Sequence, residues 1–222
     1  MTKFNFNKSF KRILDIMLAL ILLVIFLPLI IIVSIAIKID TRGPVIFKQL
    51  RIGENGKIFK IYKFRTMIKN AEFIGSGLFN VRDDFRVTRV GKILRKTSID
   101  EIPQLINILR GEMSFVGPRP PVIYELGDYK NFDERLKKRF TVKPGITGYA
   151  QVYGRNSLSW EEKIFFDLKY IDDFKKYGIL IDFKVLFLTV IAVLSMKNIY
   201  ELPENIEKDK KLIDENLKKI YM

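Results

Sequence analysis

The stretch Ile16–Ile37, IMLALILLVIFLPLIIIVSIAI, holds 22 consecutive residues without a charge and a proline at position 28. As one helix it would be about 33 Å long, which is enough to cross the hydrocarbon core of a bilayer. It is too long and begins too late for a removable signal peptide, and no small-residue cleavage site follows it. The stretch therefore predicts a membrane element near the N-terminus.

The proline and the flanking charges leave two topologies open for this element. Pro28 removes a backbone donor, so the helix should kink or break into halves of about 15 to 18 Å. Basic residues flank the stretch on both sides: Lys3, Lys8, Lys11 and Arg12 before it, and Lys38, Arg42, Lys48 and Arg51 after it. A re-entrant helix–break–helix places all of them on one anionic membrane face. Proline kinks also occur in true spans, so a single span stays open on these grounds.

The overall composition excludes several kinds of chemistry. The chain has 222 residues, a net charge of +14, and neither cysteine nor histidine. Disulfides, thiolate zinc sites, iron–sulfur clusters, Ser-His-Asp triads and imidazole acid–base catalysis are therefore excluded. Catalysis would rest on carboxylates, Lys, Arg, Tyr, hydroxyls or a metal held by oxygen ligands. The excess of 39 Lys and Arg over 25 Asp and Glu favours a polyanionic partner: nucleic acid, an anionic membrane or a phosphorylated substrate.

The pattern predicts a helix-rich α+β chain in three parts. We expect an N-terminal flank and membrane helix at 1–40, a small domain at 41–200 and a charged tail at 201–222 that is a solvated helix or disordered. The expected elements are a β-hairpin over 45–64 with its turn at 53–56, a loop over 68–87, helices over 102–109, 121–140 and 159–175, a short strand at 149–153, and an apolar helix over 179–196. Ser157 or Ser159 is the expected cap of the helix at 159–175. Asp182 and Lys184 interrupt the last apolar stretch, which favours an interfacial helix over a second span.

The segment RKTSIDEIPQL (95–105) is the most informative part of the domain. One interpretation is a capping box between Ser98 and Glu101, although Pro103 would then lie too far into the helix. A helix that begins near Asp100 tolerates Pro103 in its first turn. Its positive end would then keep the carboxylates of Asp100 and Glu101 ionised. An ionised aspartate can attack phosphorus, and an adjacent glutamate can hold Mg²⁺ or manage a proton.

Five basic residues are candidate phosphate ligands. Arg95 lies just before the acidic pair and offers a bidentate guanidinium. Lys63 and Arg65 alternate on an expected strand, so they should share a face. Arg119 lies in the rigid loop GPRPP (117–121), and Arg155 follows Gly154 in a turn-rich segment. Each of these signals is weak alone, because a solvated charge or a structural turn explains it equally well.

Taken together, five segments resemble a known family. In chain order they are KR-x-x-D (11–15) before the apolar run with its proline, GPVIFKQLRIG (43–53), KFRTM (63–67), RVTRVGKILRKTSIDEIPQLINILRGEMSFVGPRP (86–120) and KPGITGYAQVYGRN (143–156). This order is similar to that of the bacterial sugar transferases, the monotopic phosphoglycosyl transferases. The resemblance covers about residues 8–195. It departs at Leu27, where relatives often carry serine before the break proline.

The resemblance implies an activity and roles for the matched residues. Members transfer a sugar 1-phosphate from a UDP-sugar to a polyprenol phosphate, commonly undecaprenyl phosphate, release UMP and so begin surface glycan assembly. By this match Asp100 forms a covalent phosphosugar intermediate, and Glu101 helps with Mg²⁺ or the lipid phosphate. Arg95 and Arg119 match phosphate-binding arginines. The resemblance makes Pro28 the break of a re-entrant helix, places the 41–200 domain on the cytoplasmic face of the inner membrane, and allows a homodimer.

A non-enzymatic alternative is a basic, membrane-anchored scaffold that binds anionic lipids or assembly partners. It predicts salt-sensitive binding to liposomes and no nucleotide-dependent chemistry. A nucleic-acid binder fits less well, because the basic residues are scattered and form no recognised motif. The sequence does not specify the sugar, the glycan pathway or the oligomeric state.

Overall fold

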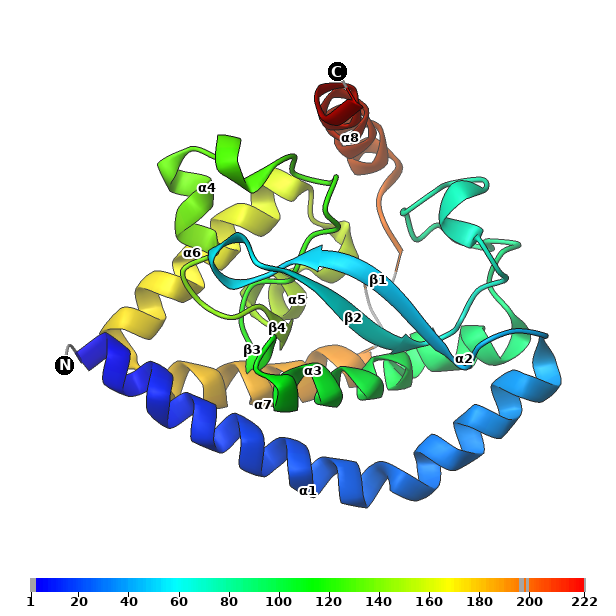
Figure 1. Ribbon diagram of the computed structural model, residues 1–222, viewed down its shortest axis with the longest axis horizontal. Helices are drawn as coiled ribbons and strands as arrows, with labels where there is room; N and C mark the ends of the chain where they lie inside the picture. Colours follow the sequence, from blue (N-terminus) through cyan, green and yellow to red (C-terminus); the bar gives the residue numbers. More distant parts are fainter. Residues whose placement is uncertain (1–2, 196–197, 199, 222) are drawn as a thin grey trace.

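The apolar N-terminal stretch forms one long helix, α1 (Lys3–Asp40), in a computed structural model that describes residues 3–195, 198 and 200–221. The helix bends near its middle, so that both of its ends turn toward the rest of the molecule (Figure 1). Pro28 lies inside the helix and cannot donate the backbone hydrogen bond of a regular turn, which accounts for a bend there. The predicted break is thus a bend in a helix that remains continuous.

Two helices expose apolar side chains at the base of the molecule. Helix α7 (Leu180–Ser195) lies near α1 at this base (Figure 1). Both carry exposed large apolar residues: Met17, Leu20, Val24, Ile25, Leu27, Ile32 and Ile39 on α1, and Leu180, Phe183, Phe187, Ile191 and Leu194 on α7. Within the described part of the chain, α1 alone is long and apolar enough to cross a membrane. The prediction that 179–196 is not a second span agrees with this finding.

Polar residues of α1 attach its first half to the domain. Arg12 donates hydrogen bonds to the carbonyls of Ile108 and Leu109 at the end of helix α3 (Leu105–Arg110). Lys11 forms an ion pair with Asp182, a buried residue in the first turn of α7, and its Nζ lies 2.5 Å from Oδ2 of that residue. The basic residues just before the apolar run therefore dock α1 on the domain.

The predicted hairpin is confirmed. Strands β1 (Ile46–Ile52) and β2 (Ile58–Phe64) pair antiparallel, with Ile46 opposite Phe64. A second, parallel pair, β3 (Ser114–Val116) with β4 (Gly145–Thr147), was not predicted. Each of its strands has three residues, too few to show an alternating pattern.

The helices differ from the prediction in three places. Helix α2 (Arg89–Thr97), which begins at the capping side chain of Thr88, was not predicted. The predicted helix over 121–140 is wrong except for α4 (Glu134–Arg139). The predicted strand at 149–153 is also wrong, because these residues form α5 (Tyr149–Tyr153), in which the rings of Tyr149 and Tyr153 pack edge to face at the four-residue helical spacing.

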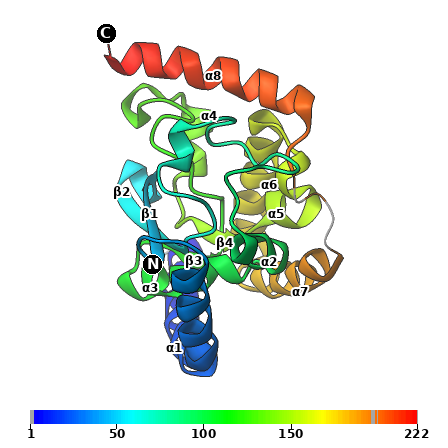
Figure 2. The same cartoon turned by 90° about the vertical axis from the view of Figure 1, so that its right-hand side faces the viewer.

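The C-terminal third is helical. Helix α6 (Trp160–Tyr177) begins with a capping box between Ser159 and Glu162, which confirms the second of the two predicted caps. The charged tail forms α8 (Pro203–Tyr221), which lies across the side of the molecule opposite α1 (Figure 2).

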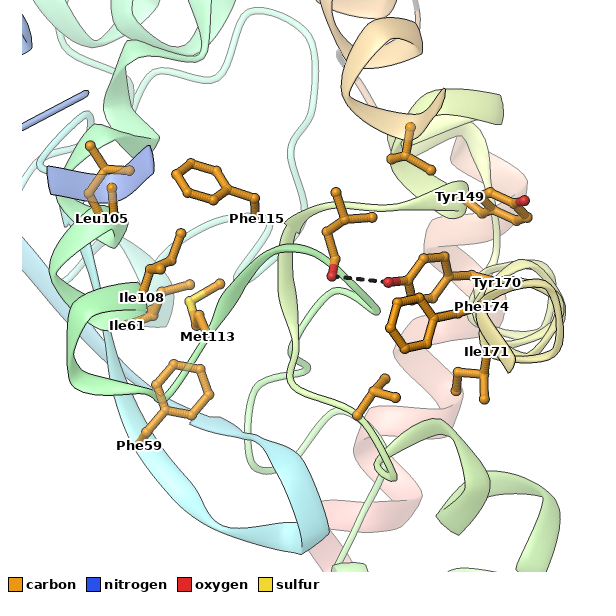
Figure 3. Packing of buried hydrophobic residues seen from close by; sticks show 14 residues of the cluster. Phe59, Ile61, Leu105, Ile108, Met113, Phe115, Tyr149, Tyr170, Ile171 and Phe174 are labelled. Carbon is orange, nitrogen blue, oxygen red and sulfur yellow. Dashed lines mark hydrogen bonds between the residues drawn. The ribbon is translucent and has the colours of Figure 1, made fainter. Parts of the chain in front are cut away.

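The main core lies between the hairpin and the C-terminal helices. Ile61 of β2 packs with Ile108 and Met113 on one side of it, and Tyr170 and Phe174 of α6 form the other side (Figure 3). The hydroxyl of Tyr170 donates to the carbonyl of Val116 in β3, at 3.3 Å. This bond joins α6 to the short strand that leads into the GPRPP loop.

A buried arginine organises the predicted loop over 68–87. Arg86 is fully buried, and its guanidinium donates to the carboxylate of Asp84 and to several loop carbonyls: Ala71, Ile74, Gly77 and Phe79. The hydrogen bonds from Arg86 hold the pKa of Asp84 below its usual range. One side chain thus closes the base of a loop with little regular structure.

We expect Arg86→Met to lower the free energy of unfolding by about 3 to 5 kcal/mol, because it removes the buried cation paired with Asp84 and the side-chain donor of several loop carbonyls. Thermal unfolding of the detergent-purified protein measures the change. Arg89→Met is the matched control, since Arg89 is exposed at the start of α2 and should give a change within about 0.5 kcal/mol. Equal effects of the two substitutions would contradict this role of Arg86.

Candidate active site

The acidic pair lies on a short 3₁₀ helix between α2 and α3. Ser98 ends α2 in the left-handed conformation (φ 58°), and the 3₁₀ helix Ile99–Gln104 follows at once. The Ser98 side chain makes no capping bond to this helix, so the capping-box interpretation is wrong. A helix start near Asp100 that accommodates Pro103 is confirmed, although its first turns are 3₁₀ rather than α.

Apolar residues on either side of the pair hold it in place. Ile99 and Ile102 are three residues apart, the spacing that aligns side chains on a 3₁₀ helix. Both pack on a cluster that includes Ile37 of α1 and Phe64 of β2. Asp100 and Glu101 instead line a cleft of about 780 Å³. The order apolar–acidic–acidic–apolar over residues 99–102 thus places the two isoleucines against the core and the two carboxylates along the cleft.

Lys63 and Arg119 face Glu101 from two other elements. The Nζ of Lys63, on β2, lies 2.6 Å from Oε1 of Glu101. The Nη1 of Arg119, in the loop after β3, lies 3.7 Å from the same oxygen, and this side chain is 38% exposed. A Cβ on Gly117 would lie 2.4 Å from the carbonyl oxygen of Lys143, so the glycine lets the Arg119 loop pack closely against the chain before β4.

Arg95 and Arg155 complete the basic surroundings of the pair. In α2, Arg95 donates from Nε to Oγ1 of Thr66 at 3.0 Å and from Nη1 to Oδ1 of Asn80 at 2.8 Å. Its charge acts on Asp100, while that of Arg155 acts on Glu101. Burial lowers the pKa of both arginines below the usual value. Four of the five predicted basic residues therefore surround the acidic pair.

Arg65 stands apart from that group, although it lines the same cleft. Its guanidinium donates to the carbonyls of Thr41 and Arg42 and to the Thr41 hydroxyl, at 2.7 to 2.9 Å. These groups lie directly after the C-terminal end of α1. Arg65 is 6% exposed, and its two Nη atoms donate to the helix end, whereas its buried Nε has no hydrogen-bond partner among the described residues. Lys63 and Arg65 thus line one cleft, as their shared strand face predicts, but their polar contacts differ.

Arg51 is a cleft residue that the sequence interpretation treated only as a flanking charge. It donates from Nη1 to the carbonyl of Pro120 at 2.9 Å, and Glu125 lies 3.6 Å from the same nitrogen. Burial lowers the pKa of Arg51 to about 10, and the nearby Arg119 contributes in the same direction. The strand pattern around Arg51 indicates which face it occupies, but only the tertiary fold brings it to the cleft.

The two carboxylates have opposite pKa shifts. Burial raises the pKa of Asp100 to about 6, against the attraction of Lys63, and the charge of Glu101 raises it further. Glu101 is also affected by burial, but Lys63 and Arg119 outweigh it, so its pKa lies below the usual value. The prediction that both carboxylates stay ionised holds near neutral pH, but burial shifts the pKa of Asp100 in the direction opposite to the one expected from a helix start. At pH 7 about nine in ten Asp100 side chains are still ionised.

The arrangement suits chemistry on a phosphorylated substrate. Within the described part of the chain, no donor forms a hydrogen bond with the Asp100 carboxylate, so its oxygens are free to reach a ligand. A separated pair of acidic pKa values is typical of sites where one carboxylate reacts and its neighbour remains charged. The surrounding cations suit the charge of a diphosphate.

Two carboxylates are compatible with a magnesium site but do not form a complete one. No group of three or more acidic side chains suited to a metal is found among the described residues. Mg²⁺ is commonly held by one or two carboxylates together with substrate phosphates and water. Asp100 and Glu101 meet that requirement only when a phosphorylated substrate supplies the other oxygens.

Comparison with known proteins places the chain in one family. The model of the family described as bacterial sugar transferase matches residues 6–196. The chain is 41% identical over 191 residues to EpsL, an uncharacterised sugar transferase of Bacillus subtilis (strain 168), covering 86% of this chain and 90% of that protein. It is 39% identical over 201 residues to the UDP-glucose:undecaprenyl-phosphate glucose-1-phosphate transferase of Klebsiella pneumoniae, covering 87% of this chain and 42% of that protein.

A third relative carries a different sugar in its name. The chain is 39% identical over 188 residues to the UDP-N-acetylgalactosamine-undecaprenyl-phosphate N-acetylgalactosaminephosphotransferase of Aeromonas hydrophila, covering 83% of this chain and 44% of that protein. The chain thus spans less than half the length of two of these relatives and most of the length of the first. Since the family model matches more than half of the chain, this protein belongs to the bacterial sugar transferase family.

Proposed function

We propose that the chain transfers a sugar 1-phosphate from a UDP-sugar to a polyprenol phosphate, with undecaprenyl phosphate as the acceptor. The observation that carries this proposal is the Asp100–Glu101 pair, which lines a cleft with Lys63, Arg95 and Arg119 in a chain of this family. Relatives named for a glucose 1-phosphate and for an N-acetylgalactosamine phosphate transfer support the reaction class. They leave the sugar open.

The proposed chemistry has two steps. An oxygen of Asp100 attacks the β-phosphorus of the UDP-sugar, the bond from that phosphorus to the bridging oxygen breaks, and UMP leaves with the electron pair. The sugar phosphate is then bound to Asp100 as an acyl phosphate. A phosphate oxygen of the polyprenol phosphate next attacks the same phosphorus, which releases the Asp100 carboxylate and gives a polyprenol diphosphosugar.

The surrounding residues have distinct proposed roles. Arg95 and Arg119 neutralise the donor's diphosphate, and Lys63 keeps Glu101 charged beside the nucleophile. Asp100 and Glu101 would hold Mg²⁺ together with the substrate phosphates, where the ion would neutralise the leaving UMP. Arg155 is placed for the acceptor phosphate, since it reaches both the carbonyl of Ala192 in α7 and Oγ of Ser98.

The position of the cleft suits a lipid-borne acceptor. Residues of α7 line it, among them Thr189, Ala192 and Val193. The opposite face of α7 carries exposed apolar side chains, as does α1. We propose that α1 and α7 lie in the cytoplasmic leaflet of the inner membrane, so that a phosphate at the membrane surface meets the cleft directly.

The direct test is turnover with purified protein. A panel of UDP-sugars is incubated with undecaprenyl phosphate and Mg²⁺, and UMP release is followed. We expect UMP with at least one UDP-sugar, dependent on the lipid for multiple turnovers. A protein that binds anionic liposomes but releases no UMP from any member of the panel would favour the non-enzymatic scaffold.

The raised pKa of Asp100 gives a pH prediction. The nucleophile must be ionised, so kcat/KM should have an acid limb with an apparent pKa near 6 and should fall tenfold per pH unit below it. An aspartate with the ordinary pKa would place the limb about two units lower. Initial rates of UMP release between pH 4.5 and 8, with unfolding checked at each pH, measure the limb. A profile that stays flat down to pH 4.5 would contradict the assignment of the limb to Asp100.

The bend in α1 gives a topology prediction. The natural chain has no cysteine, so single cysteines at residues 5 and 42 can be labelled without background. Both positions are exposed and lie near opposite ends of α1. In inverted and right-side-out membrane vesicles, we expect Asn5→Cys and Arg42→Cys to react with an impermeant maleimide from the same, cytoplasmic side. Labelling from opposite sides would demand a true span.

A further inference from the structure

The C-terminal segment from residue 200 onward lies outside the matched family region, yet it borders the candidate active site. The family model ends at residue 196. After α7 the chain leaves the apolar base, and α8 crosses the opposite side of the molecule (Figure 2). Glu201, between these two helices, lines the same cleft as Asp100 and Arg95. The segment therefore contributes Glu201 to the lining of the cleft, and this residue lies outside the region that the family model matches.

Helix α8 is attached to the domain by spaced polar contacts. Asn205 donates from Nδ2 to the carbonyl of Ser157 at 2.7 Å, and Asp209 accepts from the backbone N–H of Trp160 at 3.2 Å. Farther along, Asn216 donates to the carbonyl of Glu125 at 3.2 Å. These three residues of α8, together with Ile213, are buried. Directional bonds at both ends of the helix fix its position, and hence that of the residues just before it.

Two hydrogen bonds join Glu201 to Asn80, in the loop that Arg86 organises, and we call this pair of bonds the Glu201–Asn80 clasp. The Glu201 carboxylate accepts from the backbone N–H of Asn80 at 3.2 Å, and the N–H of Glu201 donates to the Asn80 carbonyl at 3.0 Å. Arg86 holds the loop carbonyls before this point, from Ala71 to Phe79. The clasp therefore fixes the next residue along the loop, which Arg86 does not reach.

The clasp leads directly to a residue beside the nucleophile. Asn80 accepts from Nη1 of Arg95 through its side-chain Oδ1, at 2.8 Å. The Nε of Arg95 is bound to Thr66, so the guanidinium is held at two points. Its charge acts on Asp100. The two bonds to Glu201 therefore hold the backbone of the residue whose side chain is one of the two supports of Arg95.

We propose that the C-terminal segment is part of the donor-binding site, and that Glu201 is a positioning residue that acts through Asn80 to hold Arg95 toward the diphosphate of the UDP-sugar. The inference rests on the proposed transferase function. It assigns the segment a role in binding the nucleotide donor and none in binding the lipid acceptor, since α8 lies on the side of the molecule opposite α1 (Figure 2).

The kinetic test compares Glu201→Ala, Glu201→Gln and Glu207→Ala in the full-length chain. Glu207 is exposed on α8, so its substitution controls for a lost negative charge on the same segment. We expect Glu201→Ala to raise KM for the UDP-sugar by about tenfold, as expected for a lost hydrogen bond to a carboxylate. Glu201→Gln keeps an acceptor for the Asn80 N–H and should stay within about threefold of wild type, as should Glu207→Ala. KM for undecaprenyl phosphate should not change in any variant.

A double substitution tests the route through Asn80. Asn80→Ala alone should also raise KM for the UDP-sugar. In a chain that already carries Glu201→Ala it should add less than it does alone, because the two residues act on the same guanidinium. Fully multiplicative effects, or equal KM values for Glu201→Ala and wild type, would overturn the proposal.

A measurement without turnover separates this inference from the proposed function. Hydrogen exchange of peptides that cover residues 76–82 should be faster in Glu201→Ala than in wild type and unchanged in Glu207→Ala. Unchanged exchange in Glu201→Ala would overturn the role of the Glu201 carboxylate even in an active enzyme, because the substitution removes that bond and keeps the backbone bond to Asn80. If wild type turns over no UDP-sugar, the proposed function fails, and with it the role at the donor site, whereas faster exchange would still establish the clasp itself.

Discussion

Asp100→Asn is expected to reduce the rate of UMP release by roughly four orders of magnitude or more, the scale seen when a covalent nucleophile is removed. The amide is nearly the same size as the carboxylate, so the fold should persist, but it cannot form the acyl phosphate. With UDP-sugar and no lipid, wild type should release one UMP per protein and gain the mass of a sugar phosphate. Mass spectrometry of the intact protein reads this gain, which Asp100→Asn should lack.

Asp214→Asn is the matched control for that substitution. Asp214 is exposed on α8, so the same chemical change there should leave both UMP release and the mass gain as in wild type. UMP release at the wild-type rate by Asp100→Asn would remove this residue from the mechanism. A mass gain that persists in Asp100→Asn would place the covalent bond elsewhere.

Glu101→Gln is expected to have the second-largest effect, a decrease in kcat of about a hundredfold, in the range typical of a group that assists proton or charge transfer. The charge of Glu101 also raises the pKa of Asp100. Its removal, with Lys63 then facing Asp100 alone, should move the acid limb of kcat/KM to lower pH. A loss of rate together with this shift is not what a merely misfolded site would give.

The control for Glu101→Gln is Glu161→Gln, which changes an exposed residue in the first turn of α6. Its rate and its acid limb should match those of wild type. An acid limb that moves to higher pH in Glu101→Gln would contradict the electrostatic coupling of the two carboxylates.

The part of the site nearest the nucleophile was predictable from the sequence because it is local. Asp100 and Glu101 are adjacent, Arg95 comes five residues before Asp100, and Ile99 and Ile102 supply the apolar spacing that anchors them. The hairpin was predictable for the same reason, since its alternation and its turn lie within twenty residues.

Other contributions could not be predicted because they depend on distant parts of the chain. Arg51 and Glu201 reach the cleft only through tertiary packing, and a lone charge carries no sign of such a contact. The alternation of Lys63 and Arg65 predicts a shared strand face but does not indicate which groups each side chain contacts. The end of α1 takes the guanidinium of Arg65. The raised pKa of Asp100 was not foreseen, because its main cause is burial, which cannot be judged from neighbouring residues.

The bend in α1 has a consequence for the membranes in which this protein can work. A straight span is matched to the full thickness of its bilayer, and its tilt and stability change when that thickness changes. A re-entrant helix, which we propose α1 to be, would turn back at Pro28 and would be matched only to the depth of a single monolayer. Reconstitution into lipids with shorter or longer acyl chains should therefore alter its insertion far less than that of a true span, and the far monolayer would be left undisturbed.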